Sequence, residues 1–194
     1  MTQWQTLYTG VSRAAWGYFF LYFDIRLGQL NILPEFGAYL LFLSAIHFLE
    51  GQRRDLALLR PLGWLLAAWS GLGWAAELLG AAVDFPVVGI VIGAVQMYFH
   101  FQMMTDFAAL AQCYQGADQT LDRLLRWRTL QTLLLTATTI LFYLQERLPE
   151  VWAAVMVVLA VVYIVAGICL MAALFALRRC FRDPPPEPYT PTWS

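Results

Sequence analysis

The sequence is short of charged residues and has no lysine at all. Only 13% of its 194 residues are charged, and all 12 of its basic residues are arginine. Soluble domains carry about 25% charged residues, so this chain lacks the polar surface that a water-soluble fold of its size needs. Its net charge of −1 gives no indication of a surface for nucleic acid.

Cysteine chemistry and the common enzyme motifs are also missing. The three cysteines, Cys113, Cys169 and Cys180, have no C-x-x-C spacing, so neither disulfides nor a thiol relay are expected. The chain contains no H-E-x-x-H, no G-x-S-x-G and no P-loop. We therefore expect no catalytic residues and no cofactor, although an enzyme is not excluded.

Apolar residues are abundant instead: 60% of the chain is hydrophobic, and the mean hydropathy is +0.60. They occur in runs close to the roughly 20 residues with which a helix crosses about 30 Å of hydrocarbon. The sequence predicts an all-α, polytopic membrane bundle of six transmembrane helices, in one domain over residues 1–182. The six predicted spans are 10–23, 36–49, 61–80, 86–104, 129–144 and 151–177.

The arginines predict how these spans are oriented, because basic residues near span ends stay on the cytoplasmic side. With the N-terminus inside, only Arg26 and Arg147 lie outside. We therefore expect a multi-pass protein of the cell membrane, bacterial in character, with cytoplasmic N- and C-termini.

Proline and an acidic residue mark each outward turn, at Pro34–Glu35, Asp84–Pro86 and Pro149–Glu150. Proline suits the first turn of a helix, and a carboxylate there faces the positive end of the helix dipole. Three helical hairpins follow. On the inner side, residues 120–126 carry leucines on one face and arginines on the other, so we expect them to lie in the headgroup layer. The proline-rich tail, 183–194, is expected to be disordered.

Small residues recur at helical spacing in three of the spans. Helices in lipid associate partly through close backbone approach at such residues, so spans 3 and 4 are expected to pack tightly together. The small stripe of span 1 has two interpretations: it closes the bundle, or it docks a membrane partner or a second copy of the chain. The helix-packing residues are Gly10, Ala14 and Gly17 in span 1, Gly63, Ala67, Gly71 and Ala75 in span 3, and Gly89 and Gly93 in span 4.

Polar side chains inside a span are costly and are therefore functional candidates. At about 1.5 Å per residue, Gln96 lies about 15 Å along span 4 and His100 about 21 Å, on the same face. His47 reaches a similar depth on span 2. Two histidines at one depth could bind haem or a metal, but no further ligands are in sight, so hydrogen-bonded packing is the simpler interpretation and no metal is predicted.

The leading functional hypothesis is a small-solute binding or transport subunit with an outward-facing pocket. Asp24, Arg26, Glu77, Gln96 and His100 are its candidate residues, and 27–33 would form a lid, because irregular backbone survives at membrane depth only beside protein or water. The alternative is a structural or regulatory membrane protein that acts through partner contacts.

Residues 16–41 run from Trp16-Gly17-Tyr18-Phe19-Phe20 through Asp24-Ile25-Arg26 to Ile32-Leu33-Pro34-Glu35-Phe36-Gly37-Ala38-Tyr39. This stretch resembles uncharacterised small multi-pass membrane proteins of Gram-positive bacteria, a resemblance that implies no function. In architecture, the six spans and cytoplasmic ends are similar to substrate-binding components of energy-coupling factor transporters. That similarity implies a bound small solute and docking through small residues of the first helix.

Overall fold

The computed structural model describes residues 3–23, 26–27, 30–31, 34–80, 85–112, 118–144 and 151–182. Within these ranges the chain is helical apart from one antiparallel pair of two-residue strands. The predicted tail at 183–194 lies outside the described residues. The helices are α1 (Gln3–Tyr22), α2 (Glu35–Leu49), α3 (Arg54–Leu58), α4 (Arg60–Leu78), α5 (Pro86–Gln112), α6 (Asp118–Leu144) and α7 (Val151–Cys180), and the strands are β1 (Arg26–Leu27) and β2 (Leu30–Asn31).

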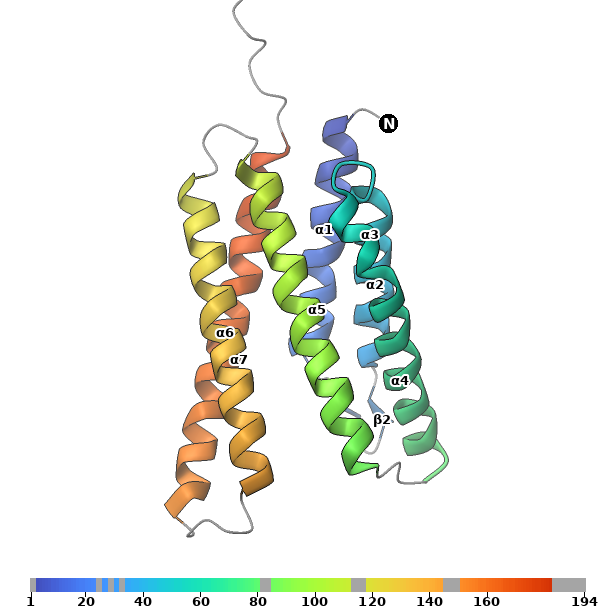
Figure 1. Ribbon diagram of the computed structural model, residues 1–194, viewed down its shortest axis with the longest axis vertical. Coiled ribbons are helices and arrows are strands. Elements are labelled where there is room, and N and C mark those ends of the chain that lie inside the picture. Colours follow the sequence, from blue (N-terminus) through green and yellow to red (C-terminus); the bar gives the residue numbers. More distant parts are fainter. Residues whose placement is uncertain are drawn as a thin grey trace, which may run out of the picture.

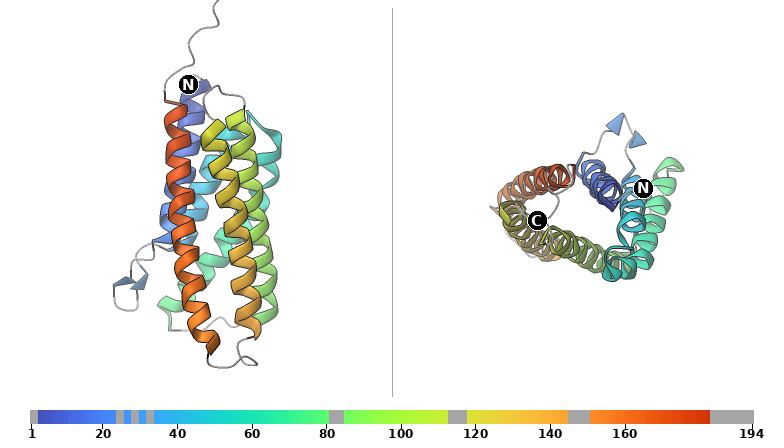
Figure 2. Two further views of the ribbon diagram at one scale, coloured as in Figure 1. Left: turned by 90° about the vertical axis from the view of Figure 1, so that its left-hand side faces the viewer. Right: turned by 90° about the horizontal axis from the view of Figure 1, so that it is seen from above.

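The long helices run side by side in alternating directions, as Figure 1 shows. The first turn of α1 and the last turn of α7 lie at the same end of the bundle. Seen from above, the helices form a ring in the order α1, α2, α4, α5, α6, α7, and α7 returns to α1 (Figure 2, right). We call the end that holds the start of α1 and the last turn of α7 the terminal end.

Two of the predicted helix starts are found where the prolines indicated them. Pro34 is the N-cap of α2, with Glu35 in its first turn, and Pro86 is the first residue of α5. A missing N–H costs nothing in these places, because the first amides of a helix have no partner inside it. Gly80, which follows α4, has a φ of +67°, a conformation that glycine adopts without steric cost.

α6 is longer than expected. We predicted a separate amphipathic piece at 120–126 in the headgroup layer, but α6 is one continuous helix from Asp118 to Leu144. Its leucine face supplies the buried Leu124 to the bundle core, and this burial explains why the segment follows the bundle axis. α1 likewise begins at Gln3, well before the predicted Gly10.

The core is densest where α1 meets α2. Gly10 and Gly17 are buried there, and a Cβ added to them would lie 2.5 Å from Leu49 Cγ and from Phe42 Cε1 respectively. The absent side chains therefore allow the close approach of these two helices. α2 also packs on α4, where a Cβ on Gly63 would lie 2.9 Å from Leu43.

The tight contact expected between spans 3 and 4 is not found. α4 packs mainly on α2 and only lightly on α5. In the described residues, nothing lies within 4 Å of a Cβ built on Gly89 or Gly93 of α5. The small residues of α4 differ in their surroundings. Ala67 is buried and Ala75 is exposed, while Gly71 approaches Phe36 of α2. The strong partner of α4 is therefore the larger aromatic and aliphatic face of α2.

Three helical segments are long and apolar enough to cross a membrane: Arg54–Leu78, Val87–Gln112 and Ala154–Cys180. α2 is apolar but has only 15 residues. Large apolar side chains cover the outside of the bundle: Val87 is 74% exposed, Leu72 64% and Val157 63%. A surface of this kind suits contact with lipid rather than with water.

Candidate functional site

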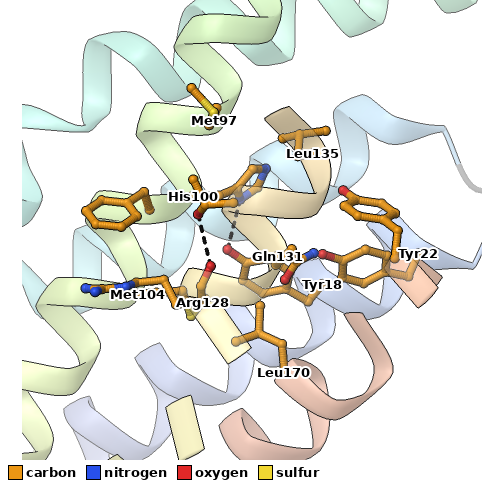
Figure 3. Close-up of a pocket in the computed structure, with 12 residues that line it drawn as sticks. Tyr18, Tyr22, Met97, His100, Met104, Arg128, Gln131, Leu135 and Leu170 are labelled. Carbon is orange, nitrogen blue, oxygen red and sulfur yellow. Dashed lines mark hydrogen bonds between the residues drawn. The ribbon is translucent and has the colours of Figure 1, made fainter. Parts of the chain in front are cut away.

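A small cavity lies between α1, α5, α6 and α7, near the middle of the bundle. Its volume is about 30 Å³, which suffices for a water molecule, since one needs roughly 10–15 Å³ of such space. Figure 3 shows polar and aromatic side chains of several helices converging on it, with Leu135 and Leu170 among its apolar walls. The lining residues are Tyr18, Tyr22, Met97, His100, Phe101, Met104, Arg128, Gln131, Thr132, Leu135, Tyr163 and Leu170.

His100 of α5 is held at this cavity by the Tyr18 hydroxyl, which lies 2.8 Å from its Nδ1. Aromatic rings surround the imidazole: the ring centroids of Tyr18, Phe42 and Phe99 lie 5.3, 5.5 and 5.4 Å from it. The other ring nitrogen, Nε2, is buried and has no hydrogen-bond partner in the described part of the chain. A neutral imidazole with one nitrogen engaged by Tyr18 can offer the other to a bound molecule, as donor or acceptor according to its tautomer.

Gln131 of α6 supplies a second unengaged group to the same cavity. The side chain is 8% exposed, and its Oε1 is buried without a partner among the described residues. Tyr163 of α7 is hydrogen-bonded to both Gln131 and Tyr22 of α1. A Cβ on Gly167, one turn after Tyr163, would lie 2.6 Å from the Tyr22 ring, so the glycine makes room for that ring. Three helices thus contribute to one hydrogen-bonded group.

Arg128 borders the cavity, but its guanidinium group is held by α5. Its Nη1 donates a hydrogen bond to the Thr105 hydroxyl at 2.7 Å. The guanidinium carbon also lies 4.2 Å from the centroid of the Phe101 ring, a cation–π contact. Arg128 therefore joins α5 to α6. The tyrosine, histidine and glutamine side chains supply the other hydrogen-bonding groups of the cavity.

A second polar group lies at the terminal end. Asp106 of α5 is fully buried, and its Oδ1 is 3.2 Å from Nε of Arg53 and 3.3 Å from the amide nitrogen of Gln102. Arg60 lies 3.0 Å from Glu50 and 3.3 Å from His47. These contacts link residues within the segment between α2 and α4 and fix that segment to α5, so their role is structural.

No protein family, curated protein or solved structure matches this chain. The site therefore has to be interpreted from its own geometry.

Of the five predicted pocket residues, the structure places His100 at the cavity. Gln96 is half-buried on α5 one turn earlier, and Glu77 is exposed in the last turn of α4; neither lines the cavity. Arg26 lies in β1, where its backbone pairs with Asn31. Asp24 lies outside the described residues, and so does most of the predicted lid at 27–33.

The two histidines have different surroundings. The side chain of His47 is 64% exposed at the terminal end and lies 3.3 Å from Glu50, whereas His100 faces the cavity. Within the described ranges, no three His, Cys, Asp or Glu side chains gather in a group that could hold a metal ion.

The sequence interpretation missed the residues that line the cavity together with His100. Tyr18 and Tyr22 are four residues apart and so share a face of α1, and Gln131 is a polar residue at the start of a predicted span. Those two signals were visible in the sequence. Their convergence on His100 was not, because it depends on which faces of α1, α5, α6 and α7 turn inward.

Proposed function

We propose that this chain is a multi-pass membrane protein whose six long helices all cross the bilayer, as three hairpins with both termini in the cytoplasm. Three segments have the length and apolarity for this by themselves. α1, α2 and α6 lie alongside them in alternating directions (Figure 1), which supports the same transmembrane placement. The arginines of the α2–α4 turn and of the end of α7 lie at the terminal end, which the positive-inside rule assigns to the cytoplasm.

We further propose that the central cavity binds a small polar solute, as a binding or transport subunit would. The observation that carries this proposal is a set of three buried polar atoms without partners among the described residues, His100 Nε2, Gln131 Oε1 and Arg128 Nε, in residues that line one cavity. A buried polar group without a partner costs about 1–3 kcal/mol, and in lipid no bulk water is at hand to relieve it. A bound molecule with a donor and an acceptor would recover that cost.

The size of the cavity favours a small solute. Arg128 contacts Thr105 and Phe101 of α5, but its Nε is buried without a partner among the described residues, so the lining also contains a cationic donor. The volume of about 30 Å³ accommodates a molecule the size of water. A larger solute enters only if α5 and α6 move apart from α1 and α7.

Ligand-dependent thermal unfolding of the detergent-purified protein tests this proposal. Formamide and acetamide are suitable probes, because each is small, uncharged and able to donate and accept hydrogen bonds. Both are larger than water, so their binding also tests whether the cavity can widen. We expect at least one of them to raise Tm with saturation, since a ligand at 100 times its Kd stabilises by about 2.7 kcal/mol.

Gln131→Leu should abolish the shift, because it removes both polar atoms of the side chain while conserving much of its volume. The matched control is Gln112→Leu at the exposed end of α5, which should keep the shift. A shift of equal size in both variants, or no saturable shift with either compound, would contradict solute binding at this cavity.

A second candidate function is contact with a membrane partner or with a second copy of the chain. One observation favours it: Gly89 and Gly93 form a G-x-x-x-G face on α5 that the described residues leave uncovered. Such faces allow two helices to approach closely in lipid. Gly89→Leu combined with Gly93→Leu should then reduce crosslinked oligomers or complexes in native membranes, with no dependence on solute.

A further inference from the structure

The outer side of α6 and α7 carries a groove near the terminal end, separate from the central cavity. Its volume is about 680 Å³, within the roughly 300–1,000 Å³ typical of ligand sites. In the left view of Figure 2, α6 and α7 face the viewer side by side. Arg123, Arg126 and Trp127 line it from α6, and Ala172, Ala173 and Ala176 from α7.

The chemistry of the groove is divided between its two walls. Arg123 and Arg126 are both exposed, and neither takes part in an ion pair within the described residues. The α7 wall consists of three alanines and Cys169, and the small alanine side chains leave room for an apolar chain. Trp127 of the α6 wall is half-buried, in keeping with the preference of tryptophan for the membrane interface.

We propose that this groove binds an anionic phospholipid of the surrounding membrane, with its phosphate at Arg123 and Arg126 and an acyl chain along the alanines of α7. The inference rests on the membrane placement proposed above, but not on the solute site. Charge complementarity selects this occupant, because unpaired arginines between helices on the cytoplasmic side attract anionic headgroups. The exposed Asp122 is not part of the lining, so the charged side chains that line the groove are Arg123 and Arg126.

Lipid titration of the detergent-purified protein tests the proposal. Phosphatidylglycerol and phosphatidylcholine are added separately in mixed micelles, with Tm and native mass spectrometry as the two measurements. We expect retained phosphatidylglycerol and at least a tenfold tighter affinity for it than for phosphatidylcholine, because each arginine near an anionic headgroup contributes about 1 kcal/mol.

The double variant Arg123→Gln with Arg126→Gln should lose about tenfold or more of its affinity for phosphatidylglycerol. Its matched control, Arg54→Gln with Arg182→Gln, removes the same charge from two other exposed positions and should keep the preference. Ala172→Leu should weaken lipid binding without any change in charge, whereas Ala160→Leu, at another exposed position of α7, should not.

Equal affinity for the two lipids would overturn the proposal, and so would an unchanged lipid preference in the Arg123 and Arg126 double variant. A Tm shift of the same size with inorganic phosphate alone would also overturn it, because it would indicate a site for free anions. Since the solute test uses Gln131→Leu and water-soluble compounds, a failure of lipid selectivity leaves the solute proposal standing. Release of the protein from membranes without detergent would remove the basis of both.

Discussion

At Gly17, the distance between α1 and α2 depends on a missing side chain. A Cβ there would lie 2.5 Å from Cε1 of Phe42, which is fully buried. We predict that Gly17→Ala destabilises the protein by about 1–3 kcal/mol, the usual cost of overpacking a core. Gly73→Ala on α4 is the control, because nothing described lies within 4 Å of its Cβ, and it should be neutral or stabilising by up to about 1 kcal/mol.

Unfolding of both glycine variants in denaturant, followed by circular dichroism in detergent, measures this difference. Equal stability of the two variants would contradict the close α1–α2 contact. It would also reopen the interpretation in which the small stripe of α1 serves a separate membrane subunit.

Asp106 is the other residue whose environment makes a firm prediction. Its carboxylate is fully buried and has Arg53 as its ionic partner in the described chain. Arg53→Met should therefore cost about 1–3 kcal/mol, because it removes a charged hydrogen-bond partner from a buried carboxylate that keeps its hydrogen bond from Gln102. The double change Arg53→Met with Asp106→Leu should restore most of that loss, and Arg54→Met, at the exposed neighbouring position, should have little effect. A double-mutant cycle of unfolding free energies that shows additive effects would exclude the pair.

The sequence could predict only part of the candidate site. His100 was predicted because an ionisable side chain inside an apolar run is unusual. Tyr18, Tyr22 and Tyr163 were not, since tyrosine is common near membrane interfaces and its hydroxyl becomes informative only when its neighbours are known. Gly167 could not be found either, because the ring that it accommodates comes from α1.

At the scale of the element, α6 shows how polar residues fit in a proposed span. Five threonines of α6 donate their hydroxyl hydrogen to a carbonyl oxygen four residues earlier, so the helix itself satisfies them. Such a helix presents little unsatisfied polarity to lipid, although α6 is not among the three segments that are long and apolar enough to cross a membrane. These residues are Thr129, Thr132, Thr136, Thr138 and Thr139.

This pattern predicts different outcomes for two changes at Thr139, which is exposed and bonded to the carbonyl of Leu135 at 2.8 Å. Thr139→Val should change stability by no more than about 0.5 kcal/mol, because the hydroxyl has no other partner to lose among the described residues. Thr139→Asp should impair insertion by about 2.5–3.5 kcal/mol, the cost of aspartate near the centre of a membrane helix. The fraction inserted in a membrane-integration assay distinguishes the two, and efficient insertion of the aspartate variant would argue against α6 as a span.

The helix boundaries also show what local sequence determines. The starts of α2 and α5 follow from their prolines, which act within a single turn. The early start of α1 and the continuous α6 do not, because both extensions are polar enough to form surface segments. Burial of Leu7 and Leu124 in the common core stabilises them as parts of the bundle, and that burial depends on tertiary packing.

At the scale of the whole molecule, the bundle has two chemically different ends. Arg53, Arg60 and Arg178 lie at or near the terminal end and contact Asp106, Glu50 and Ser12 there. The opposite end, at the turn after Gly80, has no arginine between α4 and α5. Membrane insertion machinery retains basic loops in the cytoplasm, so this asymmetry and the alternating helix directions support the topology proposed above.

Reporter fusions test that topology. Alkaline phosphatase fused after Arg182 should be inactive and a fluorescent protein fused there should fluoresce, because the proposed topology places the terminal end in the cytoplasm. Phosphatase inserted after Gly80 should be active, since that turn lies at the opposite end of α4. In the proposed topology α5, α6 and α7 all cross the membrane between Gly80 and Arg182, so the two positions lie on opposite sides. Active phosphatase at both positions would place them on the same side, and one of these three helices would then not cross. Because α6 has the least apolar first half, it would be the helix to question, and with it the placement of Gln131 at membrane depth.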